Sequence, residues 1–328
     1  MKIAIDAMGG DYAPAEVVKG AVEVAGQCGI PVILVGDQES IEQELAKYDT
    51  DDLPIEVKHA SQVVEMDDHP ANAIRRKTDS SLVIAAKLVK DGEAQAMVSA
   101  GNSGAMMAVA TLKLGRIPGI DRPAIASFLP TSKGMAVMLD AGANVDCSVD
   151  NLLQFAVIGS EYAEHVLGIE NPRVGLLSIG EEETKGDELT KATNARLKET
   201  DLNFVGNVEG KDIFRGASDV VVCDGFAGNI VLKVAEGVGE FVLGIIKSAI
   251  DPSQIDLFKP VLGKVMAKLD YAEYGGAPLL GVGGVCIICH GRSNARAIRN
   301  AVKAASAAVE NNVVRYISVA LRNRSINK

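Results

Sequence analysis

Four polar, glycine-rich stretches carry the residue types that bind an anion. They are residues 6–11 (DAMGGD), 99–104 (SAGNSG), 140–144 (DAGAN) and 224–229 (DGFAGN). Glycine lets backbone N–H groups approach a phosphate closely, while Asn and Ser side chains add neutral hydrogen bonds that orient it. A single stretch of this kind is weak evidence, because tight turns between strands and helices need glycine anyway. Four of them together predict a ligand that carries a phosphate group.

Lys185 is the cation that the sequence places best for an anionic ligand. It lies in residues 180–186 (GEEETKG), a stretch flanked by glycines that follows an apolar run. A lysine on a hinged loop can contact a phosphate or a developing oxyanion. An ion pair with Glu182 or Glu183 is the alternative explanation for its position.

His290 ends the run 286–290 (CIICH), whose spacing matches c-type haem attachment. We reject that interpretation because the run is typical of a buried strand and the chain begins without an export signal. His290 is instead a candidate ligand at a strand end, with an ordinary core or surface histidine as the alternative. The patterns GxxxxGK[ST], GxSxG and HExxH are absent, as is a well-placed GxGxxG. The chemistry therefore favours a substrate that brings its own nucleophile.

Short apolar runs alternate with stretches of helical period, which predicts an α/β fold. We expect strands at residues 2–7, 31–35, 55–58, 96–99, 124–128, 135–139, 173–179, 204–208, 220–223 and 285–289. We expect helices at residues 14–25, 40–48, 71–90, 104–114, 151–166, 186–198, 229–250 and 293–321. Several strands are apolar on both faces, so helices should cover both sides of a doubly wound sheet. Because no linker or repeat is evident, residues 1–328 are expected to form one compact unit.

Residues 236–270 break this alternation, because two helical stretches follow one another without a strand between them. This pattern predicts a helical hairpin that projects from the α/β body. Its apolar stripe needs a partner, since such stripes are rarely left exposed.

Composition excludes several classes of protein. The 328 residues carry a net charge of −10, with 48% hydrophobic and 4% aromatic residues. Disorder is excluded, and an acidic chain with few aromatic residues lacks the usual features of nucleic-acid binding. No apolar stretch approaches the length of a membrane-spanning helix, so we expect a cytoplasmic protein whose five cysteines are reduced.

The loop sequences resemble those of the bacterial phosphate acyltransferases of phospholipid synthesis. The similar stretches cover essentially the whole chain and are residues 4–14, 99–105, 139–146, 175–191, 203–210, 219–233, 271–282 and 290–302. The resemblance implies reversible transfer of a fatty acyl group from acyl carrier protein to inorganic phosphate, giving acyl phosphate for the membrane glycerol-3-phosphate acyltransferase. It also implies a homodimer with a three-layer αβα fold like that of the isocitrate dehydrogenase and phosphotransacetylase group, and no cofactor or metal.

Under this hypothesis, phosphate attacks the thioester directly and no acyl-enzyme forms. Lys185, Asn229 and His290 are expected to bind phosphate or the oxyanion, while Asp224 and Asn144 orient the loops. The expected substrate-binding residues are Asp6, Gly9, Gly10, Ser99, Gly101, Asn102, Ser103, Gly104, Asn144 and Gly228.

The alternatives are a phosphotransacetylase acting on a small acyl-coenzyme A, a dehydrogenase of related fold, and a non-catalytic phosphate-binding protein. For the hairpin, dimer packing is the first expectation and peripheral membrane contact at its tip is the second. Docking of the carrier protein on the hairpin is the third.

Overall fold

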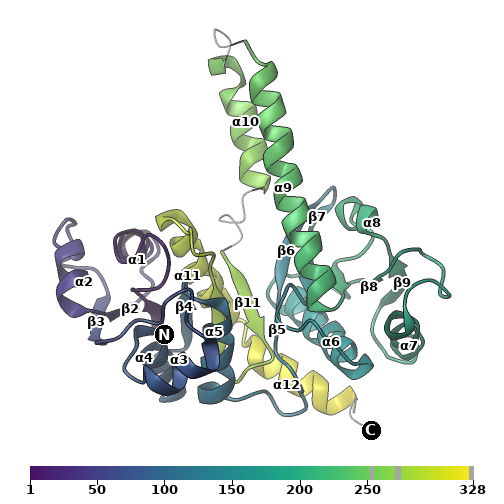
Figure 1. The fold of residues 1–328 in the computed structure, drawn as a ribbon, viewed down its shortest axis with the longest axis horizontal. Coiled ribbons are helices and arrows are strands. Elements are labelled where there is room, and N and C mark those ends of the chain that lie inside the picture. Colours follow the sequence, from purple (N-terminus) through teal and green to yellow (C-terminus); the bar gives the residue numbers. More distant parts are fainter. Residues whose placement is uncertain (252–254, 270–274, 325–328) are drawn as a thin grey trace.

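Two β-sheets organise the chain, which the computed structural model describes over residues 1–251, 255–269 and 275–324 (Figure 1). The first sheet has seven strands in the order β3 (Ile55–His59), β2 (Val32–Gly36), β1 (Ile3–Asp6), β4 (Ala96–Ser99), β12 (Val285–Ile288), β11 (Ala277–Leu280) and β5 (Ala124–Ile125). The second has five, in the order β6 (Ser127–Thr131), β7 (Gly134–Leu139), β10 (Val220–Val222), β8 (Val174–Leu177) and β9 (Phe204–Val208). All neighbours run parallel except β11 with β12 and β5, and β6 with β7.

Helices connect and cover these strands. They are α1 (Ala15–Cys28), α2 (Gln38–Leu45), α3 (Pro70–Arg76), α4 (Ser81–Lys90), α5 (Ser103–Val109), a π-helical turn (Ala110–Leu114), α6 (Val149–His165), α7 (Glu188–Leu197), α8 (Gly210–Arg215), α9 (Gly225–Ala249), α10 (Ile255–Leu269), α11 (Ala295–Glu310) and α12 (Val313–Arg324).

The seven-stranded sheet is the middle layer of a sandwich. Successive strand residues point to opposite faces, so Ile3 and Ile5 pack with α1 and α11 whereas Ala4 packs with α4 and α5. In the five-stranded sheet, Val220 and Val222 face α6, and Val221 faces α8 and the start of α9. The predicted doubly wound, three-layer architecture is confirmed. One hydrophobic cluster contains residues of both sheets, although the expectation that residues 1–328 form one unit remains a prediction.

The structure divides three of the expected elements. The expected strand 124–128 breaks at Ala126, where the chain passes from β5 in the first sheet to β6 in the second. The expected helix 71–90 becomes α3 and α4, because Lys77 leaves helical geometry and Ser80 caps the second helix. The expected helix 293–321 breaks into α11 and α12, near Asn312 with its positive φ of 50°.

Two short elements were missed by the sequence pattern. Strand β11 lies in a glycine-rich segment whose apolar residues are mostly Leu and Ala, which do not signal a strand. Helix α8 has only six residues, too few for a helical period to show.

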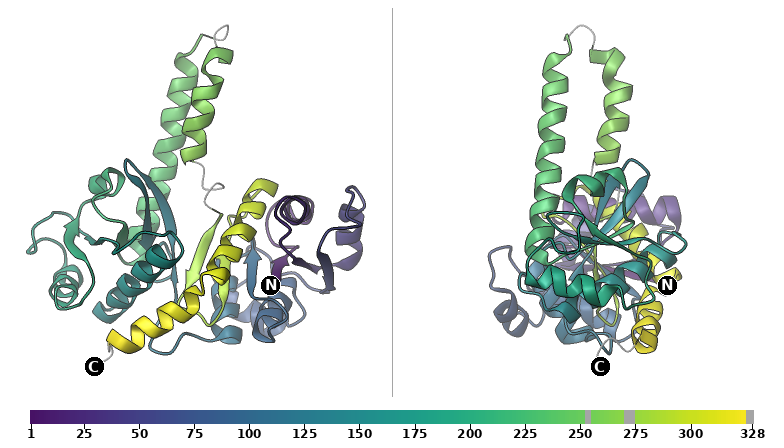
Figure 2. Two further views of the ribbon diagram at one scale, coloured as in Figure 1. Left: turned by 180° about the vertical axis from the view of Figure 1, so that it is seen from behind. Right: turned by 90° about the vertical axis from the view of Figure 1, so that its right-hand side faces the viewer.

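Helices α9 and α10 form the predicted hairpin, which stands away from the body in all three views (Figures 1 and 2). Residues 252–254 and 270 of the predicted hairpin, 236–270, lie outside the described residues. So do residues 271–274, which begin the stretch 271–282 that resembles the phosphate acyltransferases. Apolar side chains along both arms are exposed, with Phe241 at 67% and Leu257 at 75%. Among the described helices, none is long and apolar enough to cross a membrane.

Candidate active site

Asp6 and Ser99 meet at the carboxyl edge of the seven-stranded sheet, because β1 and β4 are parallel neighbours. The Ser99 Oγ donates to Asp6 Oδ2 at 2.7 Å, and the Gly101 N–H donates to Ser99 Oγ at 3.0 Å. A Cβ at Gly9 would lie 2.6 Å from Asp6 Oδ2, so only glycine fits there. Asp6, Gly9, Ser99 and Gly101 form what we call the Asp6 cluster.

Asn102 has a structural role beside this cluster. Its Oδ1 accepts from the Ala105 N–H at 3.0 Å and caps α5, while its Nδ2 donates to backbone carbonyls of the segment 65–68. Gly104 packs closely on Pro70, from which a Cβ would be 2.8 Å away. Ser103 is exposed, so of the five expected ligands in the stretch 99–104 it is the one that presents its side chain to solvent.

His290 lies at the same edge, just beyond β12, the other neighbour of β4. The Asp11 N–H donates to the Gly291 carbonyl at 2.7 Å, which ties the first loop to the last one. Gly10 makes this turn with a φ of 106°. The His290 ring is exposed and its Nδ1 accepts from the Arg292 N–H at 3.2 Å. The structure therefore brings the stretches 6–11 and 99–104 together with His290.

Asp140 organises a second cluster, at the carboxyl edge of the five-stranded sheet. It is fully buried, and its Oδ2 accepts from the Asn144 N–H at 2.6 Å and from Asn144 Nδ2 at 3.0 Å. Its Oδ1 accepts from the Ile125 and Ala143 N–H groups. The Gly225 N–H donates to the Asn144 carbonyl at 2.7 Å, which joins the loops after β7 and β10. The sequence placed Asp140 in one of the four polar stretches but assigned it no role of its own, although it directly follows the buried strand β7.

The first turn of α9 packs against this loop. A Cβ at Gly228 would lie 1.9 Å from the Asp140 carbonyl oxygen, so the approach requires glycine. Asp224 caps the helix by accepting from the Ala227 N–H at 2.8 Å. The Asn229 side chain would lie 3.5 Å from a Cβ at Gly142, so it packs against the same loop. We use the name Asp140 cluster for Asp140, Gly142, Asn144, Gly225 and Asn229.

Burial controls the protonation of the groups in both clusters. It raises the pKa of Asp6 and of Asp140, against the opposing effect of the hydrogen bonds that each carboxylate accepts. Burial also raises the pKa of Cys147 to about 11 and that of Cys223 well above its ordinary value. Because a nucleophilic cysteine must be a thiolate, these two thiols beside the Asp140 cluster are poor nucleophiles at neutral pH.

Among the described residues, no hydrogen bond or ion pair joins Lys185 to either cluster. Its side chain is exposed, in the loop that follows β8, and its N–H donates to the Glu182 carbonyl at 3.0 Å. Glu183 pairs with Lys198 instead. Within the described residues, the Lys185 ammonium group has no ion pair, so the alternative explanation for its position is not observed.

Three large apolar side chains are exposed at the edge of the sheet that holds the Asp140 cluster. Val145 and Ile179 lie in the loops after β7 and β8, and Phe226 lies in the first turn of α9, which follows β10; β7, β10 and β8 are adjacent strands of the sheet. Their exposed fractions are 62%, 81% and 61%. We call these residues the apolar rim. Polar loops bordered by exposed apolar side chains can bind a ligand with one anionic and one apolar part.

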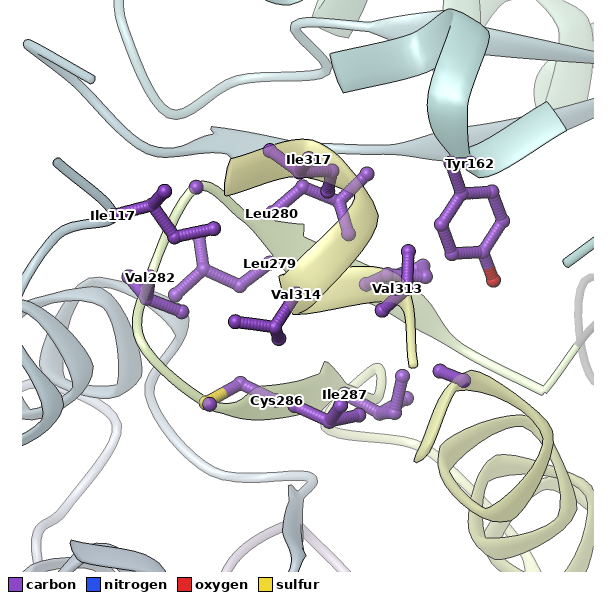
Figure 3. A pocket seen from close by; sticks show the side chains of 15 residues that line it. Ile117, Tyr162, Leu279, Leu280, Val282, Cys286, Ile287, Val313, Val314 and Ile317 are labelled. Carbon is purple, nitrogen blue, oxygen red and sulfur yellow. The ribbon is translucent and has the colours of Figure 1, made fainter. Parts of the chain in front are cut away.

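Two other features were considered as ligand sites. The carboxylates of Glu181, Glu209 and Asp212 lie within 4.8 Å of one another, but Lys211 pairs with Glu209 and Arg215 with Asp212, and we assign them no metal. The cavity between α12 and strands β11 and β12 is lined by apolar side chains (Figure 3). Its volume of about 10 Å³ is too small for an acyl chain, so it belongs to the core.

Solved structures with this fold include phosphotransacetylases. A phosphotransacetylase from Streptococcus pyogenes matches with a TM-score of 0.66 and 18% identity, covering 94% of both chains. A branched-chain phosphotransacylase from Enterococcus faecalis matches with a TM-score of 0.59 and 15% identity, covering 94% of this chain and 99% of the other. The fold is thus that of the phosphotransacetylase group, as expected.

Closer relatives define the family. Residues 1–316 match the family model described as "Fatty acid synthesis protein". The chain is 54% identical over 327 residues to a phosphate acyltransferase of Desulforamulus reducens, covering 98% of both chains. It is 55% identical over 322 residues to that of Pelotomaculum thermopropionicum, covering 97% of this chain and 94% of the relative. The chain belongs to the phosphate acyltransferase family and is a transferase, which confirms the resemblance seen in the sequence.

Proposed function

We propose that this enzyme reversibly transfers a fatty acyl group from acyl carrier protein to inorganic phosphate. The product is an acyl phosphate, which serves phosphatidic acid synthesis. The family supports acyl transfer to phosphate, and the carrier-protein donor is our proposal.

The juxtaposition of the Asp140 cluster and the apolar rim carries this proposal. The cluster offers polar and backbone groups to an anion, Val145 and Phe226 offer apolar contact within the same two segments, and Ile179 lies in the loop after the adjacent strand β8. Burying apolar surface stabilises a complex by roughly 25 cal/mol per Å². An acyl chain covered by these side chains would hold its carbonyl carbon beside the bound phosphate.

In the proposed reaction, a phosphate oxygen attacks the thioester carbonyl carbon. The C–O bond forms, the C–S bond breaks, and the carrier thiolate leaves and takes up a proton. Lys185, Asn229 and His290 bind the phosphate or the tetrahedral oxyanion, and proximity supplies much of the rate. Asp224 and Asn144 hold the loops in place. Two hydrogen bonds support this role: Asp224 accepts from the Ala227 N–H, and the Asn144 side chain donates to Asp140.

We propose that the ten substrate-binding residues expected from the sequence, from Asp6 to Gly228, bind the phosphate. Asn102 and Gly104 would act by shaping the loop, because their side-chain positions are already used in packing and capping. An acyl-enzyme trapped after quenching with a labelled acyl donor would contradict direct attack by phosphate.

A phosphotransacetylase acting on a small acyl-coenzyme A is the second candidate function, and the fold likeness favours it. Phosphate-dependent thiol release from acyl-carrier protein and from acetyl-coenzyme A distinguishes the two. A dehydrogenase would instead turn over NAD, and a non-catalytic binding protein would release no thiol.

We further propose that the exposed stripe on the hairpin packs against a second copy of the chain, and that the hairpin tip contacts the membrane surface near the acyltransferase that consumes acyl phosphate. The enzyme would work in the cytoplasm and at that surface. The exposure of Phe241 and Leu257 supports an apolar partner for the hairpin.

A further inference from the structure

The stretch from His290 to Val309 has an unusual charge pattern. The whole chain has 33 basic and 43 acidic residues, yet this stretch contains no acidic residue. Its cations are Arg292, Arg296, Arg299 and Lys303. Helix α11 carries the last three at a spacing of three or four residues, which places them on one face. The opposite face, with Ile298 and Val302, is buried.

Helix α1 lies beside α11 and extends this surface (Figures 1 and 2). The two helices approach closely at Gly20, where a Cβ would be 2.7 Å from the Cβ of Ile298. Outside this contact is a hollow of about 310 Å³, and its lining includes Lys19, Arg296 and Arg299. We refer to Lys19, Arg292, Arg296, Arg299 and Lys303 as the cationic stripe.

The two acidic residues of the hollow are used within the protein. A carboxylate oxygen of Glu16 accepts from the Ala295 N–H at 2.6 Å, at the start of α11, and Glu23 lies 3.5 Å from Arg299. Lys19 and Lys303 are exposed. In the part of the chain that the structure describes, neither lysine has an ion pair. Positive charge therefore remains available on this surface.

The stripe begins next to the candidate active site. Arg292 is two residues from His290, and the loop between them is tied to Asp11 at the edge that holds the Asp6 cluster. A donor attached to a carrier protein must dock near this edge for its thioester to reach the loops. An acidic partner is repelled by the net charge of the whole chain, so a local cationic surface directs it to one place.

We propose that the cationic stripe is the docking surface for the carrier protein, and that it contacts an acidic helix of that partner. The assignment of the partner rests on the proposed function. Exposed charge pairs of this kind act mainly on the rate of association and on its dependence on salt.

Charge reversal at the two lysines tests the proposal. The double variant Lys19→Glu with Lys303→Glu leaves the loops and His290 unchanged, and Lys58→Glu with Lys90→Glu is a matched control at exposed lysines elsewhere. Each protein is assayed with palmitoyl-carrier protein and with palmitoyl-pantetheine, an uncharged donor. We expect kcat/KM for the carrier-linked donor to fall about tenfold or more in the first variant only, with a weaker dependence on salt.

The small donor separates docking from catalysis. Equal losses with both donors, or a wild-type kcat/KM for the carrier-linked donor, would overturn the proposal and leave the proposed function standing. Absence of turnover of palmitoyl-carrier protein by the wild-type enzyme would overturn the proposed function, and the docking surface with it.

Discussion

The proposed role of Lys185, to bind the phosphate or the oxyanion, can be tested directly by substitution. It is exposed, and within the described residues it has no ion pair that would explain its position. If it contacts phosphate or the oxyanion, Lys185→Ala should lower kcat by about 100-fold with the fold intact. Lys191→Ala is the control, since Lys191 is exposed and pairs with Glu188 at the surface. Wild-type turnover in the Lys185 variant would remove it from the site.

Asp140 offers a prediction about stability and pH. Replacing it with Ala leaves the buried N–H of Asn144 without its acceptor, and we expect a loss of about 3 kcal/mol in the free energy of unfolding. Asp140→Asn keeps one acceptor oxygen and should lose less. Urea denaturation measures both losses. A change below about 0.5 kcal/mol in the Ala variant would contradict the role of Asp140 in holding the loop.

The pH dependence follows from the raised pKa of Asp140. Because the folded pKa lies above the unfolded one, the stability that Asp140 contributes is fully present below the unfolded pKa. It is lost as pH rises through the folded pKa. The Asn variant cannot ionise, so its stability deficit relative to wild type should shrink as pH rises above the ordinary pKa of an aspartate, about 4. A deficit that grows with pH would show that the folded pKa is lowered instead.

Among the loops, the apolar rim predicts chain-length selectivity. Phe226 is 61% exposed, and Phe226→Ala should raise KM for a palmitoyl donor about tenfold while leaving a butyryl donor unaffected. Phe214→Ala, at an exposed phenylalanine on α8, is the control. If both donors lose equally, the side chain supports the loop and does not contact the acyl chain.

The hairpin predicts contact with lipid at its tip. Leu257 and Phe258 are 75% and 39% exposed on α10, and replacing both with Glu removes apolar surface and adds negative charge. Sedimentation with anionic vesicles should then show weaker binding, since interfacial binding depends on buried apolar area and on attraction to anionic lipid. Unchanged vesicle binding would exclude these two residues from the membrane contact.

Helices, strands and their loops were predictable where the local residue types alone determine the local structure. Asp6 and Gly9 mark the end of β1 and belong to the Asp6 cluster, and Gly228 allows the first turn of α9 to pack against Asp140. The division of the sheet could not be predicted, because the passage at Ala126 depends on which strands β5 and β6 pair with. Asp140 lies in one of the four polar stretches, but its role was not predicted, since its hydrogen bond from the Ile125 N–H joins two segments that only the fold brings together, whereas its bonds from residues 143 and 144 are local.

At the scale of the whole molecule, the two sheets place two polar clusters on one chain, and the comparisons place that chain among the phosphate acyltransferases. No contact between the two clusters is observed among the described residues. The proposed function assigns the expected ligands of both clusters to a single reaction.

The most direct test is a phosphate-dependent thiol-release assay with palmitoyl-carrier protein, palmitoyl-coenzyme A and acetyl-coenzyme A, in which hydroxylamine traps the acyl phosphate. The account predicts phosphate-dependent release and a trapped palmitoyl phosphate, with the carrier-linked donor preferred. Preference for acetyl-coenzyme A, or no phosphate-dependent release from any donor, would contradict it.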